Sequence, residues 1–386
     1  MPAAKLSHDQ ITALARLRHA LHAAPELSGQ EENTARVIAD FLSPTRPDQI
    51  VTGLGGHGVA VVYEGREPGP TVLFRAELDA LPIEEASTLP HRSQRAGVAH
   101  LCGHDGHMAS LAGLGLLLGA ARPARGRVIL LFQPAEETGA GARAVLADPQ
   151  FKALRPDWAF ACHNMPGLPL GAIAIAPGPA SCASVGLRLC YTGRETHASV
   201  PEQGASPAPA LAALILALAP DTVARPMGPE FRLATLCHLS MGARAFGIAP
   251  GQAEALVTLR ALSDAALEAF AAEVSARAQA DAGGLALQIT RHDHFNATIN
   301  DAEAAAHVAR AGQALGLEQA DFALPMRAAE DFGAFSAETR TAMFFLGSGT
   351  AQPALHDPAF DFPDALLPIA CEIFAQLLDT VSAHPA

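Results

Sequence analysis

The chain has 386 residues, of which 49% are hydrophobic and 17% are charged, and its formal net charge is −13 at pH 7. This length exceeds one ordinary hydrophobic core, so we expect two domains. The acidic balance argues against nucleic acid or an anionic membrane surface as a partner. The longest apolar runs, residues 111–121 and 208–219, are too short to span a bilayer.

The N-terminal segment, residues 1–24, is typical of an amphipathic helix, because charged and polar residues interrupt its apolar positions. It contains no continuous apolar stretch of the kind found in secretory signals. The six cysteines of the chain show no spacing typical of a disulfide framework. Disulfides are rare in compartments that keep thiols reduced, and we therefore expect a cytoplasmic protein.

A second helix is predicted from Ser28 or Gly29 to Leu42, because Glu31 follows Ser28 at the spacing of a capping box. Strands then alternate with helices, and polar residues follow the strand ends. Such a pattern indicates an α/β sheet with a functional site along the edge where the strands end. The predicted elements are strands 58–63 and 71–75, a helix 108–121, and strands 127–132 and 158–162.

The pattern changes after a stretch rich in proline, glycine and small residues at 176–181. Beyond it the predicted order is β-α-β-β-α-β, with strands 185–191, 232–240, 253–261 and 286–293 and helices 204–218 and 264–280. This order is that of a ferredoxin-like unit, which is complete in itself. We therefore expect one domain formed by residues 1–182 and 297–386, interrupted by an inserted domain at 183–296. The last part predicts helices 301–315, 330–335 and 365–381 and a strand 342–347.

Residues that bind transition metals gather around Cys102, His104 and His107. Their spacing differs from that of structural zinc sites, which pair two cysteines or two histidines at fixed offsets. Further ligands are therefore expected from elsewhere in the chain, as in catalytic sites. Candidates at the ends of predicted elements are Glu136, Glu137, His163 and His356. Of the two adjacent glutamates, one could bind metal while the other acts as a base.

Eight segments carry a resemblance to a known family: LHAAPELSGQEENTA (21–35), FRAELDALPIEE (74–85), HLCGHDGHMASLAG (100–113), LFQPAEETGAGA (131–142), HNMPGLPLG (163–171), AAEDFGAF (328–335), FFLGSG (344–349) and LHDPAFDFPD (355–364). In this order they resemble the M20 metallopeptidases, specifically the amidohydrolase branch that hydrolyses N-acyl amino acids, hippurate and indole-acetyl amino acids. The resemblance implies an α/β fold. It consists of a zinc-peptidase-like catalytic domain, with a mixed sheet flanked by helices, and an inserted ferredoxin-like (βαββαβ) lid domain.

The resemblance also implies roles for individual residues. It assigns two divalent metal ions to Cys102, His104, Glu137, His163 and His356, with the Cys102 thiolate between the ions. Zinc, manganese, cobalt and nickel all suit these ligand types. Glu136 resembles the general base, and Asp79 resembles an acid that orients a ligand without binding metal. Asp105 and His107 match the motif, but the family does not use them as metal ligands.

In the lid, His197 matches a histidine that stabilises the oxyanion, often from the other subunit of a dimer. A homodimer or higher homo-oligomer formed through the lid is therefore implied. Arg260 matches an arginine that binds the substrate carboxylate. Two departures concern this region: Glu195-Thr196 replaces the family's usual Gly-Gly, and Gly247 replaces an asparagine.

The predicted function is metal-dependent hydrolysis of the amide bond of N-acyl amino acids or related small conjugates, by metal-activated water with Glu136 as base. The predicted partners are small molecules, with no nucleic acid and no membrane. One alternative is a dipeptidase or carboxypeptidase on the same site. A second makes Cys102 a covalent nucleophile of an amidase, and a third is a non-catalytic binder on a degenerate peptidase scaffold.

Overall fold

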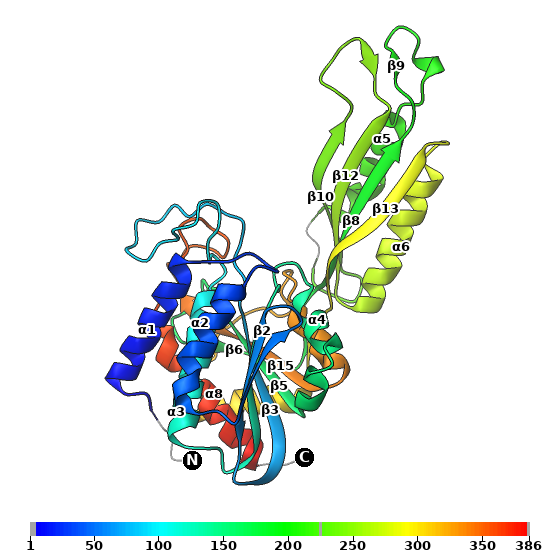
Figure 1. Cartoon of the computed structure of the whole chain (residues 1–386). Helices are drawn as coiled ribbons and strands as arrows, with labels where there is room; N and C mark the ends of the chain where they lie inside the picture. Colours follow the sequence, from blue (N-terminus) through cyan, green and yellow to red (C-terminus); the bar gives the residue numbers. More distant parts are fainter. Residues whose placement is uncertain (1–4, 224–225, 384–386) are drawn as a thin grey trace. The chain divides into compact units, whose positions relative to one another are not determined.

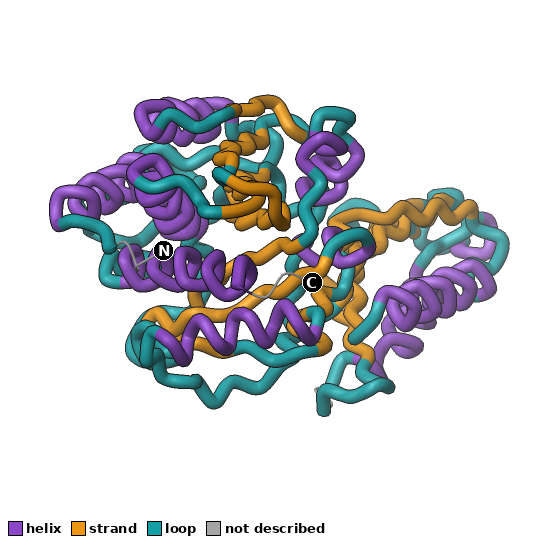
Figure 2. Tube along the Cα trace, turned by 90° about the horizontal axis from the view of Figure 1, so that it is seen from below, coloured by secondary structure: helices purple, strands orange, loops and turns teal. Residues whose placement is uncertain are grey.

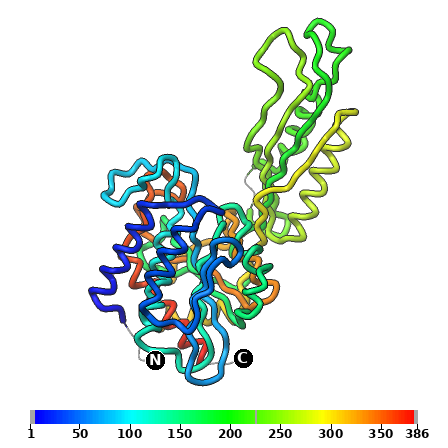
Figure 3. Tube along the Cα trace, viewed as in Figure 1, coloured from blue at the N-terminus to red at the C-terminus, as the bar shows by residue number. Residues whose placement is uncertain are grey.

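The computed structural model describes residues 5–223 and 226–383. The chain divides into two compact units. The first contains the residues up to 180, residues 298–324 and the residues from 331 onward, and the second contains residues 181–297 and 325–330. Figure 3 shows how the orange-to-red C-terminal part returns to the unit that contains the blue N-terminal part.

A seven-stranded sheet with the order β1-β2-β4-β3-β5-β15-β6 forms the centre of the first unit (Figure 1). Strands β4, β3, β5 and β15 run parallel to their neighbours within this group, and the remaining pairs are antiparallel. The sheet is therefore mixed, which confirms the predicted fold class. Its strands are β1 (Gln49–Leu54), β2 (Gly58–Glu64), β3 (Glu67–Glu77), β4 (Arg125–Gln133), β5 (Trp158–Pro166), β6 (Ile173–Ala174) and β15 (Arg340–Gly349).

The helices of this unit are α1 (His8–Ala23), α2 (Glu32–Leu42), α3 (His104–Ala120), α4 (Gly141–Ala147), α7 (Ala302–Ala314) and α8 (Leu366–Ala383). They appear in purple beside the orange strands in Figure 2. Helix α3 is apolar on all sides and almost entirely buried, as expected of a helix enclosed by other elements. Gly115 lets it approach α2 closely, since a Cβ there would lie 2.5 Å from Leu42 Cδ2.

Helix α1 begins at a capping box formed by Ser7 and Gln10. Leu14, Leu17 and Leu21 follow at helical spacing and are buried in the core. Arg18 lies on the same buried side of the helix, although it carries a charge. A buried arginine requires carboxylate partners, and these connect α1 to the candidate site described below.

The predicted start of the second helix is wrong. Helix α2 begins at Glu32, and its N-cap residue, Glu31, makes no side-chain capping bond. The Ser28 hydroxyl donates to Asp79 Oδ2 (2.7 Å), and Glu31 Oε1 accepts from the backbone N–H groups of Gly29 and Ala135 (both 2.8 Å). The Ser28 hydroxyl is thus taken by a distant residue, and Glu31 bonds to the turn before α2 and to the distant Ala135 instead of closing a capping box.

Other boundaries also differ from the predictions. Helix α3 begins at His104, not Met108, so His104 and His107 lie in its first turn. The predicted helix 330–335 is a 3₁₀ helix, η5 (Asp331–Ala337). Strand β1 and helix α4 were not predicted. The shorter 3₁₀ elements of the chain are η1 (Ser43–Thr45), η2 (Phe151–Leu154), η3 (Pro201–Gln203) and η4 (Ala219–Asp221).

The second unit contains a four-stranded antiparallel sheet with the order β10-β12-β8-β13. Its elements follow the chain order β-α-β-β-α-β and enclose a hydrophobic core of their own. They are β8 (Ala183–Thr192), α5 (Ala208–Leu218), β10 (Arg232–Met241), β12 (Gln252–Ala261), α6 (Asp264–Ala280) and β13 (Ala286–Phe295). The remaining strands of the described chain form two short pairs. In the second unit β9 (Thr196–His197) pairs with β11 (Ile248–Ala249), and near the boundary between the units along the chain β7 (Gly178–Ser181) pairs with β14 (Thr298–Asn300).

One segment lies in a different unit from the one predicted. Residues 325–330 belong to the second unit, whereas the predicted division places them in the last stretch of the first domain. Two hydrogen bonds hold the segment there: Cys182 N–H donates to the Ala328 carbonyl, and Arg260 Nη1 donates to the Arg327 carbonyl (both 3.1 Å). In the described part of the chain, no helix combines the length and the apolar character needed to cross a membrane.

Candidate metal centre

The candidate ligands of the first unit follow neighbouring parallel strands of the central sheet. Asp79 lies two residues beyond the end of β3, and Glu136 and Glu137 follow β4, while His163 lies within the last residues of β5. Since β3 lies between β4 and β5 and runs parallel to both, the three strands end at the same edge of the sheet.

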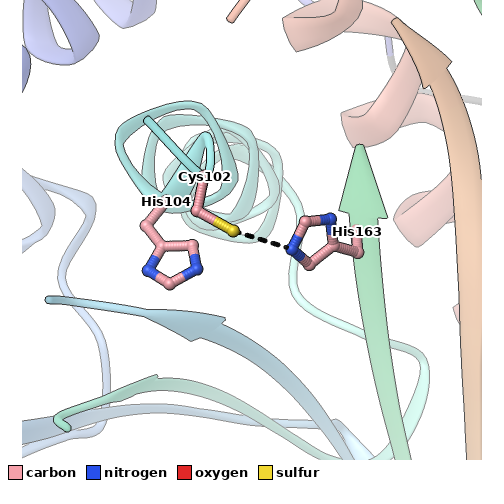
Figure 4. A group of neighbouring side chains, drawn as sticks. All are labelled: Cys102, His104 and His163. Carbon is pink, nitrogen blue, oxygen red and sulfur yellow. Dashed lines mark hydrogen bonds between the residues drawn. The ribbon is translucent and has the colours of Figure 1, made fainter. Parts of the chain in front are cut away.

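Two groups of three donor atoms share the sulfur of Cys102. The donor atoms of Cys102, His104 and His163 lie within 4.8 Å of one another, and so do those of Cys102, Glu137 and His356. Figure 4 shows the first group, in which Cys102 Sγ lies 3.4 Å from His163 Nε2. All five residues predicted as metal ligands are therefore close together, with the thiol common to both groups.

The two adjacent glutamates approach His104 equally closely. Glu136 Oε2 and Glu137 Oε1 each lie 3.9 Å from His104 Nε2, and Glu137 Oε1 also lies 3.9 Å from His356 Nε2. The turn before them is strained, because Ala135 has a φ of +51°, which is unusual for a residue with a side chain. The bond from Ala135 N–H to Glu31 holds this turn in place.

Hydrogen bonds orient both buried histidines. His104 Nδ1 lies 2.9 Å from the Asp79 carbonyl oxygen, and His163 Nδ1 lies 2.7 Å from that of Asn164. A carbonyl oxygen can only accept, so Nδ1 of each ring carries a proton and Nε2 is the nitrogen left to bind an ion. The buried Nε2 of His104 makes no hydrogen bond with any residue that the structure describes. This arrangement fits a metal ion that would bind at Nε2.

The electrostatics of the group also suit metal ligands. Burial lowers the pKa of His163 to about 3, so its imidazole is neutral at physiological pH. Burial raises the pKa of the Cys102 thiol to about 12. Without a cation the thiol therefore keeps its proton, which makes it a poor nucleophile, whereas a bound divalent ion would remove that proton.

Asp79 supports two candidate ligands. Its backbone carbonyl accepts from His104, and its Oδ2 accepts from the Glu137 backbone N–H (2.9 Å) and from the Ser28 hydroxyl. Burial opposes ionisation of this carboxyl, but the hydrogen bonds from His104, Ser28 and Glu137 lower its pKa. Asp79 is thus a carboxylate in contact with the ligand-bearing segments, as its predicted role requires.

His356 differs from the other candidates because it comes from a loop and its side chain is 49% exposed. Its φ is +67°, and its backbone N–H donates to the Leu101 carbonyl (2.8 Å). Burial and the nearby His104 lower the pKa of its imidazole. The position of this ligand therefore depends on how its loop is anchored.

His107 and Glu77 could also be taken for ligands, because their donor atoms lie within 4.8 Å of a nitrogen of His104. Both His107 nitrogens have partners, however: Nδ1 lies 2.8 Å from Glu77 Oε2 and Nε2 lies 2.6 Å from Asn164 Oδ1. Glu77 is in addition paired with Arg75. These side chains form a buried network beside the candidate ligands.

Sequence reasoning assigned no role to Asn164 or Glu77. Asn164 holds His107 with its side chain and His163 with its carbonyl. It also restricts Gly103, whose φ is +93° and where a Cβ would lie 2.3 Å from Asn164 Oδ1. The available signals were the position of Asn164 directly after His163 and an acidic residue, Glu77, at the end of a buried strand.

The two residues predicted in the lid both lie in the second unit. His197 is exposed on β9, and its Nδ1 lies 2.7 Å from Ser199 Oγ. Arg260 lies on β12, where burial lowers the pKa of its half-buried guanidinium and its Nη1 donates to the Arg327 carbonyl. Gly247, one of the departures from the family pattern, accepts at its carbonyl from the Ala198 backbone N–H.

Comparisons with known proteins agree with this arrangement. N-acetylcysteine deacetylase of Bacillus subtilis is 30% identical over 370 residues, which are 95% of this chain and 96% of the relative. Hippurate hydrolase of Campylobacter jejuni is 30% identical over 366 residues, 94% of each chain.

Solved structures are similar over nearly the whole chain. The Bacillus subtilis YXEP protein, described as a dinuclear metal binding peptidase from the M20 family, matches with a TM-score of 0.81 and 28% identity, covering 98% of this chain and 99% of that one. A putative aminohydrolase from methicillin-resistant Staphylococcus aureus matches with a TM-score of 0.83 and 27% identity over 96% of each chain. The sequence model of the family described as "Peptidase family M20/M25/M40" matches residues 73–380. The chain therefore belongs to peptidase family M20/M25/M40.

Proposed function

We propose that this chain is a two-metal amidohydrolase that cleaves the amide bond of N-acyl amino acids or related small conjugates. The observation that carries the proposal is the pair of three-donor groups that share Cys102, with Glu136 outside both. Three protein ligands for each ion leave a coordination position open for water or substrate, as in catalytic zinc sites. The acylated substrate class is supported by the deacetylase and the hippurate hydrolase among the relatives.

Two divalent ions of zinc, manganese, cobalt or nickel would supply an acidified water and a polarised carbonyl when bound. Cys102 would hold both ions, His104 and His163 one of them, and Glu137 and His356 the other. Glu136 then takes a proton from the attacking water at its carboxylate. As the C–N bond breaks, Glu136 delivers this proton to the departing nitrogen, giving a carboxylic acid and a free amine.

His197 would stabilise the oxyanion. The Ser199 backbone N–H donates to His197 Nδ1 (3.2 Å), so Nδ1 holds the lone pair and Nε2 of the neutral ring carries the proton. Nε2 is thus a hydrogen-bond donor on an exposed side chain, as an oxyanion requires. His197→Ala should lower kcat and leave the metal content unchanged, and an unchanged kcat would exclude this role.

Arg260 would bind the carboxylate of the substrate. Its guanidinium is half-buried, and a carboxylate ligand would provide the opposite charge that a buried cation requires. With Gly247 in place of the family's asparagine, the anchor would have one donor fewer. N-acyl amino acids should therefore be cleaved faster than their neutral amides, and equal rates on both would contradict a carboxylate anchor.

The alternative with a covalent cysteine is disfavoured by the burial of Cys102 and its raised pKa. The non-catalytic alternative is disfavoured because every candidate ligand and Glu136 is present. A dipeptidase would use the same metal centre and differ only in the acyl part of its substrate, so substrate comparison must separate the two.

The proposal is tested by assaying metal-free enzyme resupplied with zinc, manganese, cobalt or nickel on N-acetyl amino acids, N-benzoyl amino acids and dipeptides. We expect no activity without metal and restored cleavage of one N-acyl series. Full activity in the presence of a chelator would contradict the metal-dependent mechanism. Cleavage of dipeptides alone would support the peptidase alternative.

A further inference from the structure

Arg18 of α1 is a buried cation with three carboxylate partners. Its side chain is 1% exposed. Nη1 donates to Asp105 Oδ2 (3.1 Å) and to Asp361 Oδ1 (2.8 Å), and Nε donates to Asp364 Oδ1. Burial opposes its charge, but the three carboxylates raise the pKa of the guanidinium above its ordinary value. Arg18 is therefore charged at every physiological pH.

The three carboxylates come from two segments that carry candidate metal ligands. Asp105 directly follows His104 in the first turn of α3. Asp361 and Asp364 lie in the loop that extends from His356 to the start of α8. The Arg18 guanidinium thus connects two segments. The first turn of α3 contributes His104 to one donor group, and the loop contributes His356 to the other.

The loop from 356 to 364 depends on such anchors, because it contains no helix or strand. Its beginning is held by the bond from His356 N–H to the Leu101 carbonyl. In its middle, the Phe362 ring packs so closely on α3 that a Cβ at Gly106 would lie 2.2 Å from it. Pro358 accepts at its carbonyl from the Ala86 backbone N–H (2.8 Å), and Phe360 is buried in the core. Arg18 holds the two carboxylates of the last part of the loop, and the His356 side chain itself is half-exposed.

We infer that Arg18 is a positioning residue of the metal centre, which fixes the loop bearing His356 to the first turn of α3 bearing His104. The inference rests on the proposed two-metal function. Arg18 makes no hydrogen bond to His104 or His356 and acts through the carboxylates that follow them in the chain. Because a change in ligand position of a few tenths of an ångström alters metal binding, outer contacts of this kind affect affinity by about 10–100-fold.

Arginine suits this role better than lysine. Its guanidinium offers five N–H groups in a rigid plane, so it can bond to three carboxylates in fixed directions. A lysine would provide the charge without these directions. His22, one turn along α1, supports the same arrangement, because its Nδ1 lies 2.9 Å from Asp105 Oδ2.

The test should remove the hydrogen bonds from Arg18 to the loop and leave the bond between Arg18 and Asp105 intact. Asp361 and Asp364 are 24% and 39% exposed, so Asp361→Ala together with Asp364→Ala should still fold. The matched control removes the same charge from exposed positions of the same unit, with Asp40→Ala and Glu67→Ala. Arg18→Lys serves as the conservative variant at the centre of the cluster.

The readout is a cobalt(II) titration of metal-free full-length protein, followed by the absorption of the bound ion and by elemental analysis. We expect the double loop variant to bind one ion as the wild type does and the other about 10–100-fold more weakly. Arg18→Lys should also bind one ion more weakly than the wild type does. The control should bind both ions with wild-type affinity.

Wild-type affinity for both ions in the double loop variant would overturn the inference, even if its melting temperature fell. Equal weakening of both ions would also overturn it, because that result indicates general loosening of the fold. Failure of the proposed function is distinguishable from either result: the wild type itself would then bind fewer than two ions.

Discussion

The histidines that flank Cys102 each have one ring nitrogen committed to a backbone carbonyl. The Asp79 and Asn164 carbonyls fix the protonated Nδ1 of His104 and His163, so that Nε2 of each ring is the atom that would bind a metal ion. The orientations of both rings are thus determined before any ion binds, which reduces the reorganisation that metal binding would require. Glu136 belongs to neither donor group that contains Cys102, although its Oε2 lies 3.9 Å from His104 Nε2, and the proposed chemistry assigns it the moving proton.

Replacing Glu136 with glutamine tests that assignment. Glu136→Gln keeps the size of the side chain but cannot accept a proton, so kcat should fall by about 10²–10⁴-fold. Metal content should be unchanged, because Glu136 belongs to neither donor group that contains Cys102. Steady-state kinetics with elemental analysis check both points, and a wild-type kcat would remove Glu136 as the base.

His22 should make stability depend on pH. The Asp105 carboxylate raises the pKa of His22 to about 9 against the opposing effect of burial. A raised folded-state pKa stabilises the protein fully below the unfolded value of 6.5, and this contribution is lost as pH rises through 9. The shift corresponds to at most about 3 kcal/mol.

Urea unfolding of the wild type and of His22→Gln between pH 6 and 9.5 measures this contribution. The difference in unfolding free energy between the two proteins should shrink as the pH rises. A difference that stays constant over this range would show that the pKa of His22 is the same in the folded and the unfolded protein.

At the scale of elements, the first turn of α3 determines the positions of Cys102, His104 and Asp105. Gly103 precedes this turn with a φ of +93°, and a Cβ there would collide with Asn164. The turn therefore requires glycine for two reasons, backbone conformation and space.

Gly103→Ala should lower both stability and metal content, because Asn164 must move and with it the carbonyl that holds His163. The matched control is Gly97→Ala, whose φ is +72° but where a Cβ would meet no atom within 4 Å. The control should lose only the strain energy, about 1–2 kcal/mol, and keep its metal. Equal metal content in the two variants would show that the contact with Asn164 is unimportant.

Strong local patterns predicted most helices and strands, because apolar periodicity determines which face of an element is buried. The capping box at Ser28 failed because the hydroxyl bonds to Asp79, 51 residues away. Arg18 and Asn164 escaped notice for the same reason: their partners lie far along the chain. The candidate ligands could be named through the family resemblance, but their hydrogen-bonded supports could be found only in the fold.

At the scale of the whole molecule, we propose that two copies associate through their second units. Strand β10 is an edge strand of its sheet, and it exposes Leu239 and Met241. On the neighbouring helix α5, Leu216 is 74% exposed. Unprotected edges and exposed apolar side chains of this kind are typical of association surfaces. The family resemblance implies that a second copy of this chain covers this surface of β10 and α5.

The mass in solution, measured by light scattering, tests this association. The wild type should have at least twice the chain mass of 39.9 kDa, and Leu216→Glu with Met241→Lys should shift it toward the monomer. A monomeric wild type would contradict the proposal. His8→Ala, at an exposed position of the first unit, serves as a control and should leave the mass unchanged.

The central claim is that one sulfur serves two metal ions, and the most direct measurement is the metal content of wild-type protein and of Cys102→Ala by elemental analysis. The wild type should hold two equivalents. The variant should hold clearly fewer, because both donor groups lose a member. Two full equivalents in the variant, or fewer than two in the wild type, would contradict the account.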